Sequence, residues 1–130
     1  MIPQEDMSGC AVACVAALLG ESYTQALLHF EHPEYASLRG YYAKEVVDAL
    51  HHAGIEAELK YVKPYMRQEI EKLGTIVFCE RDPAYPNGHY LLKTTQGWMN
   101  PWANFPSMTV RAAVQDGLPS RPQYAIFSRV

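Results

Sequence analysis

The sequence has few cysteines and no excess of charge of one sign. Three cysteines occur among its 130 residues, at positions 10, 14 and 79. A small odd number of cysteines does not indicate a disulfide framework, so we expect a reducing compartment and a cytoplasmic protein. The formal net charge is −3, and the lysines and arginines are scattered along the chain. This distribution argues against a basic face for nucleic acid and against a polybasic membrane anchor.

Long hydrophobic runs, a basic N-terminal segment, internal repeats and low-complexity stretches are also absent. The longest apolar run, residues 10–19, is too short to span a membrane. The first residues, MIPQEDMSG, lack the basic region of a signal peptide. Hydrophobic residues make up 48% of the chain and charged residues 19%, which is typical of a globular protein. The length fits one domain, so we expect residues 1–130 to form a single domain.

The hydrophobic pattern predicts helices first and a sheet afterwards. Val46, Val47 and Leu50 recur at helical spacing, which makes residues 42–53 the clearest amphipathic helix. The predicted helices are residues 10–19, 23–30 with Ser22 as N-cap, 42–53 and 65–73. The predicted strands are residues 55–62, 75–79, 89–95, 98–102 and 124–130, with loops at 37–40 and 80–88 and a short helix or turn at 107–114 capped by Ser107. Helices that precede an antiparallel sheet indicate an α+β fold.

Cys10 is the first candidate for chemistry. It follows Gly9 at the start of the predicted helix 10–19, where unpaired backbone N–H groups create a positive potential. Both features favour the thiolate, which is the reactive form of cysteine. The small residues Ser8 and Gly9 would let a substrate approach closely. The alternative is that Cys10 is a small hydrophobic core residue.

The other two cysteines have simpler interpretations. Cys14 lies one turn beyond Cys10 and deeper in the apolar run, and Cys79 ends a predicted buried strand. We expect both in the core. A zinc site made of Cys10, Cys14 and a histidine is disfavoured, because structural zinc requires four ligands in a compact pattern. We therefore expect no metal and no cofactor.

Among the histidines, His89 has a distinctive position. It follows Asn87-Gly88 and opens an apolar strand, which can direct its side chain into a cleft. The alternative is a surface histidine at a strand edge. The other histidines lie near the ends of predicted helices, and no catalytic role is needed to explain them there. They are His29, His32, His51 and His52.

The predicted hairpin places Asn100 near His89. With a two-residue turn at 95–96 or 96–97, one face of the hairpin carries His89, Leu91, Asn100 and Trp102. A cysteine nucleophile needs a base, and the base needs a hydrogen-bonding partner on its other nitrogen, which asparagine can supply. Trp98 and Trp102 flank Asn100 and are expected to shield the pair from water. The alternative is that Asn100-Pro101 is only a turn.

Gln4 lies six positions before Cys10. Its amide nitrogen can donate hydrogen bonds, so we expect that nitrogen to point into the cleft. Together with the backbone N–H of Cys10, it would then stabilise an oxyanion. Because Gln4 belongs to a polar segment, we expect it to contribute little to stability.

Taken together, these residues resemble a known family. The block from Gln4 to Cys14, QEDMSGCAVAC, resembles the opening of the bacteriocin-processing cysteine peptidases. These papain-like domains head peptide-exporting ABC transporters and cut leader peptides after a double glycine. The family has a glutamine six residues before its nucleophile and a second cysteine four residues after it, as here. Further matches follow in the family's order over nearly the whole chain: SLRG at 37–40, LHHAGIEA at 50–57, Gly88-His89-Tyr90 and Asn100-Pro101.

The resemblance implies a papain-like fold with N-terminal helices packed against an antiparallel β-sheet. It also implies a cysteine hydrolase that acts on a peptide or protein substrate. In this reading Cys10 is the nucleophile, His89 the base and Asn100 the orienting group, with Gln4 at the oxyanion hole. The sequence departs from the family at Gly9, Ala11 and Asn100, where an acidic residue, a glycine and an aspartate are usual. Two alternatives follow: an inactive peptide- or protein-binding module of the same fold, and a cysteine-dependent transferase or deamidase.

Overall fold

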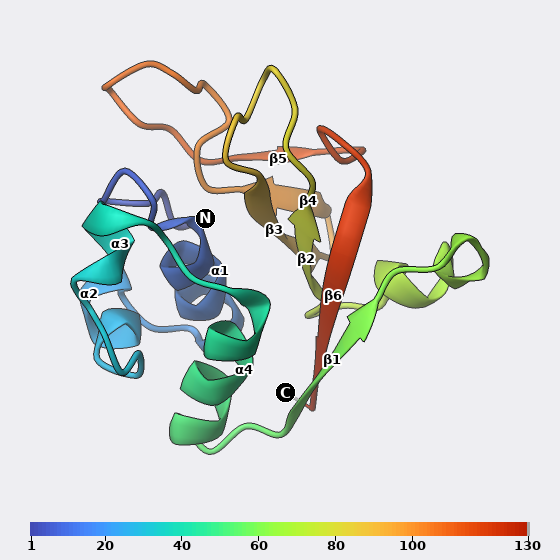
Figure 1. Cartoon of the computed structure of the whole chain (residues 1–130), viewed down its shortest axis with the longest axis horizontal. Coiled ribbons are helices and arrows are strands. Elements are labelled where there is room, and N and C mark those ends of the chain that lie inside the picture. The colour runs from blue at the N-terminus through green and yellow to red at the C-terminus, as the bar shows by residue number, and fades with distance from the viewer. Residues whose placement is uncertain (130) are drawn as a thin grey trace.

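Within residues 1–129, which the computed structural model describes, four α-helices lie beside a six-stranded sheet (Figure 1). The helices are α1 (Cys10–Leu19), α2 (Tyr23–Leu27), α3 (Tyr35–Leu38) and α4 (Ala43–His52). The strands are β1 (Ala57–Tyr61), β2 (Ile76–Cys79), β3 (His89–Thr94), β4 (Gly97–Asn100), β5 (Ala113–Gln115) and β6 (Pro122–Ser128). Two short 3₁₀ turns, Pro64–Met66 and Glu69–Glu71, connect β1 to β2.

The sheet is antiparallel throughout. Its strand order is β1-β6-β2-β3-β4-β5. The β3–β4 hairpin pairs Leu92 with Met99 and Thr94 with Gly97, so its turn contains two residues, Thr95 and Gln96. This is one of the two turns predicted, and it gives the predicted parity. The α+β fold class expected from the sequence is confirmed.

Strand β5 occupies residues 113–115, so the short helix or turn expected at residues 107–114 was wrong for its end. Its start does form a turn at Ser107, whose Oγ accepts from the N–H of Thr109 at 3.3 Å. The strand forms because the free edge of β4 pairs with it, Trp98 opposite Gln115 and Asn100 opposite Ala113. Three residues of alternation are too few for a sequence pattern to reveal a strand. The pairing that creates β5 joins segments about fifteen residues apart, which local propensity does not encode.

Two helical predictions also differ from the structure. Residues 35–38 form α3, where a loop was expected from residue 37. Residues 64–71 form two 3₁₀ turns in place of the α-helix predicted at 65–73. Each of these turns buries one side chain, Met66 or Ile70. So little apolar contact does not stabilise a continuous helix, because short helices depend on packing.

Helix α1 lies at the centre of the main core. It contacts α2, α4 and β3, and its residues Ala11 to Ala16 are all buried, as expected for a helix that is apolar nearly all round. Full burial of Val12 and Val15 stabilises the fold by about 1.5–3 kcal/mol each. Gly20 ends α1 in the left-handed conformation, with φ 69°. Ser22 caps α2 as predicted, because its Oγ accepts from the N–H of Gln25 at 3.1 Å.

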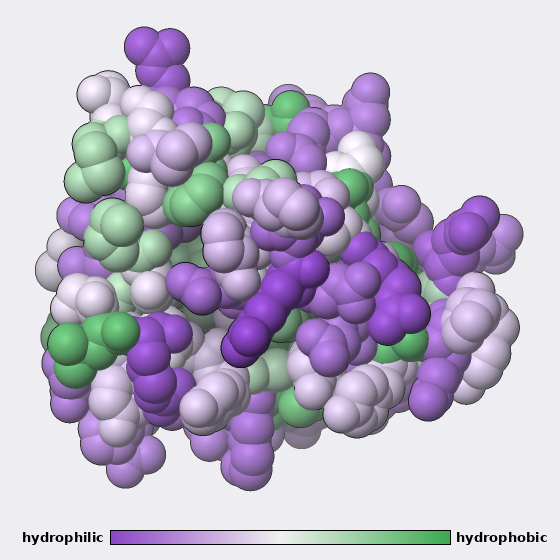
Figure 2. All heavy atoms as spheres, turned by 45° about the horizontal axis from the view of Figure 1, so that its top comes forward, coloured by the Kyte–Doolittle hydropathy of each residue, from purple (hydrophilic) through white to green (hydrophobic). Residues whose placement is uncertain are grey.

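A second apolar cluster covers the opposite face of the sheet. Its buried members are Ile70, Val77, Cys79, Leu91, Trp98 and Ala125. The sheet is therefore buried on both faces around β2 and β3, which holds the start of β3 rigidly beside α1. No helix in residues 1–129 is long and apolar enough to cross a membrane. Hydrophilic side chains dominate the face of the molecule in Figure 2, and the hydrophobic ones occur in small separate groups.

Candidate active site

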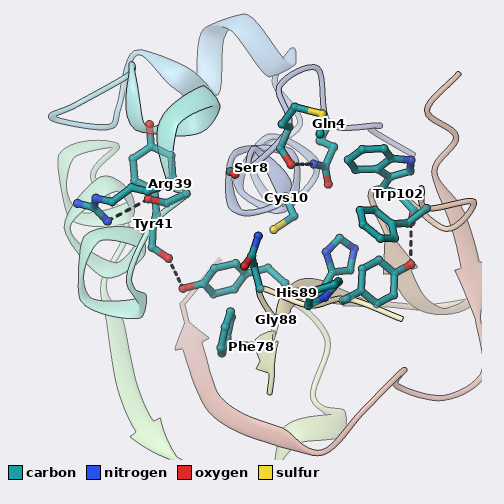
Figure 3. A pocket seen from close by; sticks show the side chains of 16 residues that line it. Gln4, Ser8, Cys10, Arg39, Tyr41, Phe78, Gly88, His89 and Trp102 are labelled. Atoms are coloured by element: carbon teal, nitrogen blue, oxygen red, sulfur yellow. Dashed lines mark hydrogen bonds between the residues drawn. The ribbon is translucent and has the colours of Figure 1, made fainter. Parts of the chain in front are cut away.

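A narrow cleft lies where the N-terminus of α1 meets the start of β3 (Figure 3). The space within this open cleft is small, about 90 Å³. Its lining includes the side chains of Gln4, Cys10, Tyr41, His89 and Trp102. The structure therefore brings Gln4, Cys10 and His89 to one place, although 85 positions separate the first from the last. Asn100 lies behind His89, away from the lining.

Cys10 is the first residue of α1 and is partly exposed in the cleft. Burial of the thiol raises the pKa of Cys10 to about 11. Hydrogen bonds from the backbone of Tyr90, Ala11 and Cys10 itself act in the opposite direction and lower this pKa. The expected field of the helix end is therefore present, but burial outweighs it in the unliganded protein. Cys10 carries a proton at neutral pH.

His89 is held by Asn100. The Nε2–H of His89 donates to Asn100 Oδ1 at 2.6 Å, and the two side chains are only 4% and 1% exposed. Burial lowers the pKa of His89 to about 4, while the bond to Asn100 raises it by a smaller amount. The imidazole is therefore neutral at neutral pH. With Nε2 protonated, Nδ1 carries the lone pair that can accept a proton.

Tyr85 is a member of the site that the sequence analysis did not identify. Its ring stacks on the imidazole of His89, with centroids 4.0 Å apart and planes 9° from parallel. Tyr85 lies in the loop 80–88, in a turn closed by Asp82, whose Oδ1 accepts from the N–H of Ala84 at 2.9 Å. An aromatic residue between Pro83 and Pro86 was the available signal, but nothing local indicates that its ring would cover His89.

The expected shielding by two tryptophans is only half right. Trp102 is buried, lines the cleft, and donates its backbone N–H to Asn100 Oδ1 at 3.0 Å. Trp98 instead packs with the second apolar cluster, beside Leu91 and Val77. Tyr85 covers the His89 ring in its place.

Gln4 is oriented differently from the expectation. Its Nε2 donates to the carbonyl oxygens of Asp6 and Met7, at 3.0 and 3.1 Å. The nitrogen therefore does not point into the cleft, and Figure 3 shows the amide oxygen directed towards the side where Cys10 and His89 lie. That oxygen is buried and has no hydrogen-bond partner among the described residues. Rotating the amide by 180° would place the oxygen against two carbonyl oxygens, so the carbonyls set this orientation.

Gly9 is required by the packing of the loop before Cys10. A Cβ at this position would collide with the hydroxyl of Tyr23. That hydroxyl donates to Asp6 Oδ2 at 2.7 Å and so ties the loop to α2. The tyrosine thus occupies the space that a side chain at position 9 would need, which explains the glycine in front of Cys10.

The remaining cysteines and histidines lie outside the cleft. Cys14 and Cys79 are buried in the core, as expected. His29 Nε2 pairs with Glu21 at 2.9 Å, and its Nδ1 lies 3.4 Å from Nδ1 of His52. Within residues 1–129, no group of three or more histidine, cysteine, aspartate or glutamate side chains is arranged to hold a metal ion.

Comparisons with known proteins identify the fold. No protein-family model matches the chain, and no curated protein matches it. Among solved structures, the chain matches the crystal structure of the peptidase domain of Streptococcus ComA, described as a bi-functional ABC transporter involved in a quorum sensing pathway. The match has a TM-score of 0.63 and 18% identity, and it covers 98% of this chain and 95% of the other. The chain therefore has the fold of this peptidase domain, in agreement with the family resemblance that the sequence indicated.

Proposed function

We propose that this chain is a papain-like cysteine hydrolase that cleaves peptide or isopeptide bonds. In this proposal Cys10 is the nucleophile, His89 the general base and Asn100 the group that orients His89. One observation carries it: in the cleft that holds Cys10, His89 donates Nε2–H to Asn100 and so keeps Nδ1 free as a base. A buried histidine paired with a buried asparagine beside a cysteine at a helix N-terminus suits nucleophilic catalysis.

The reaction would begin from a neutral pair. Nδ1 of His89 takes the thiol proton as Sγ of Cys10 attacks the substrate carbonyl carbon. The tetrahedral intermediate collapses when the imidazolium gives that proton to the leaving nitrogen, which breaks the C–N bond and leaves a thioester. Water then attacks the thioester and loses a proton to His89, and return of this proton to sulfur restores Cys10.

The developing oxyanion needs donors near Cys10. The backbone N–H of Cys10 is in the first turn of α1, where N–H groups have no partner within the helix. Gln4 is the second candidate, as the glutamine-to-cysteine spacing suggests. Its nitrogen must first release the carbonyl of Asp6 or Met7, so donation by Gln4 would occur only when substrate is bound.

The shape of the surface favours an extended peptide as substrate. The narrow space at Cys10 shares Tyr41, Phe78 and Asn87 with a larger hollow of about 790 Å³. That hollow continues to Arg81 and Gln123, which offer polar groups to a backbone. A small molecule would fill only the narrow part, whereas an extended chain can occupy both.

A second candidate is an inactive module of the same fold that binds a peptide without cutting it. Two observations favour it. The pKa of Cys10 is raised by burial, and the nitrogen of Gln4 is already bonded to backbone carbonyls. Both would slow acyl transfer without closing the cleft.

A cleavage assay on a complex peptide mixture separates the two candidates. The chain and its Cys10→Ala variant are incubated with a proteome-derived peptide library, and new N-termini are labelled and identified by mass spectrometry. We expect new termini with the parent and with Cys14→Ala, and none with Cys10→Ala. No products from either protein while peptides are retained on the chain would support the binding module. Identical products from the parent and Cys10→Ala would contradict the assignment of Cys10 as the nucleophile.

A further inference from the structure

Asn100 is held by a closed set of hydrogen bonds. Its Oδ1 accepts from His89 Nε2 at 2.6 Å and from the N–H of Trp102 at 3.0 Å. Its Nδ2 donates to the hydroxyl oxygen of Tyr85 at 3.0 Å and to Oε1 of Gln115 at 3.0 Å. An amide has two donor hydrogens and two acceptor lone pairs, so every hydrogen-bonding position of Asn100 is filled.

The direction of each bond is fixed from outside. The hydroxyl hydrogen of Tyr85 is used on the carbonyl of Trp102, at 2.7 Å. Nε2 of Gln115 donates to the carbonyl of Gly117, at 2.9 Å, which turns its Oε1 towards Asn100. Both Tyr85 and Gln115 therefore present acceptors to Asn100. A flipped Asn100 amide would turn its oxygen towards two acceptors and its nitrogen towards the N–H of Trp102, so it would lose three of its four bonds. The fourth would survive only if His89 moved its hydrogen from Nε2 to Nδ1.

We propose that Tyr85 and Gln115 are positioning residues that set the tautomer of His89 by fixing the orientation of Asn100. The chain of bonds runs from the Gly117 carbonyl through Gln115 and Asn100 to His89. Because Asn100 can offer only its oxygen to Nε2, the imidazole hydrogen stays on Nε2 and the lone pair stays on Nδ1. This inference rests on the proposed function for its catalytic meaning, but the tautomer itself is a property of the free protein.

The same arrangement accounts for an asparagine at position 100. An aspartate there would turn a carboxylate oxygen towards two acceptors in place of the NH₂ group. Tyr85 could then donate to the carboxylate only by breaking its hydrogen bond to the Trp102 carbonyl, and Gln115 only by breaking its hydrogen bond to the Gly117 carbonyl. Tyr85 also stacks on the His89 ring, so it restrains the ring directly as well as through Asn100.

Nitrogen-15 NMR of histidine-labelled protein tests the inference without any substrate. The His89 signals are assigned by their absence in His89→Ala. In the parent at pH 7, we expect a protonated Nε2 and an unprotonated Nδ1. Gln115→Leu removes one acceptor and Tyr85→Phe the other, and we expect each to show a mixture of the two tautomers or an inverted one.

Two variants serve as matched controls. Gln115→Glu keeps an acceptor oxygen for Asn100 while losing the bond to Gly117, so we expect the parent tautomer. Tyr85→Phe keeps the stacked ring that Tyr85→Leu removes, so comparison of the two separates the hydroxyl from the stacking. Melting temperatures of all variants show whether each is folded.

Kinetics on a cleaved peptide complete the test. We expect Gln115→Leu to lower kcat roughly tenfold with little change in KM, and Gln115→Glu to restore most of it. A parent tautomer and unchanged kcat in folded Gln115→Leu and Tyr85→Phe would overturn the positioning role while leaving the hydrolase intact. Altered tautomers in a chain that cleaves nothing would support the positioning network and count against the hydrolase.

Discussion

At the scale of single residues, burial decides the charge of the candidate catalytic pair. It raises the pKa of the Cys10 thiol to about 11 and lowers the pKa of the His89 imidazole to about 4. Removing either group from water disfavours its charged form, and each charged form has few compensating partners. Between these two values the pair is thiol and neutral imidazole. Proton transfer would therefore accompany attack on the substrate instead of preceding it.

The pH dependence of labelling tests this charge state. Between pH 7 and pH 10, we expect the rate of Cys10 alkylation by iodoacetamide to rise about tenfold per pH unit, because the thiolate fraction does so below the pKa. Cys10 should remain faster than Cys14 and Cys79, which are buried and have pKa values raised further. Mass spectrometry of timed samples measures each site. A plateau near neutral pH would instead indicate a preformed thiolate–imidazolium pair.

Gln4 illustrates how burial changes the role of one side chain. The residue is 3% exposed and holds the carbonyls of Asp6 and Met7. We expect Gln4→Ala to lower the free energy of unfolding by about 1–3 kcal/mol, because it leaves two carbonyls without their donor. This replaces the sequence-based expectation of a negligible effect on stability. Urea unfolding measures the change.

Turnover by the same variant measures the oxyanion role separately. If Gln4 also donates to the oxyanion, kcat should fall roughly a hundredfold at a temperature where Gln4→Ala is fully folded. Gln4→Glu is the sharper variant, since a carboxylate can donate to neither the carbonyls nor the oxyanion. A destabilised but fully active Gln4→Ala would restrict Gln4 to a structural role.

At the scale of elements, the entry into β3 places His89. Gly88 adopts φ +78°, and a Cβ there would collide with the ring of Phe78 and lie 2.9 Å from the carbonyl oxygen of Cys79. The Phe78 ring in turn packs against Tyr90, with centroids 4.9 Å apart. The backbone of β3 can therefore lie against β2 immediately before His89 only because residue 88 lacks a side chain.

Gly88→Ala should consequently displace His89. We expect a loss of stability well above the 1–2 kcal/mol that positive φ alone costs, together with slower alkylation of Cys10. Gly54→Ala is the matched control, because Gly54 has φ +85° and open space around the position of its Cβ. Thermal unfolding and labelling rates of the two variants are compared. Equal destabilisation by Gly88→Ala and Gly54→Ala would show that the Phe78 ring moves aside at little cost in free energy. The close approach at Gly88 would then be unimportant.

At the scale of the whole molecule, the two faces of the sheet are covered by different structures. The helices and the main core cover one face, and the smaller cluster around Trp98 and Leu91 covers the other. The cleft opens at the end of the sheet where α1 begins. The buried His89 makes the stability of the whole molecule sensitive to acid, because the folded state resists a proton that the unfolded chain accepts.

The sign of this effect follows from the lowered pKa of His89. Below about pH 6.5 the unfolded chain binds a proton at this residue, whereas the folded protein does so only near pH 4. Stability is thus lost as the pH falls through this window, by roughly 2–3 kcal/mol at pH 4.5. Urea unfolding at pH 7 and pH 4.5 measures it. His89→Gln should lose less stability over this range than the parent; an equal loss would assign the acid sensitivity to other groups.

Much of the local structure could be predicted from the sequence. Four predicted features depend only on spacing within a few residues. They are the helix that begins at Cys10, the Ser22 cap, the amphipathic helix before Gly54 and the two-residue hairpin turn. The parity that brings Asn100 to the side of His89 follows from the period of two in a strand. These features depend on local geometry, whereas the expectation of a papain-like fold came from the resemblance of the motifs around Gln4, Cys10, His89 and Asn100 to a known family.

The tertiary structure alone decided the remaining features of the site. Strand β5 exists because β4 offers it an edge, and only that pairing brings Gln115 to Asn100. Tyr85 covers His89, and the nitrogen of Gln4 turns to two carbonyls, through contacts that no local pattern encodes. The pKa values of Cys10 and His89 depend on burial by segments distant in sequence. The sequence by itself therefore determined that Gln4, Cys10 and His89 meet in the cleft. Packing determined their orientation, their charge and their further neighbours, because hydrogen-bond direction and desolvation arise only when distant segments come into contact.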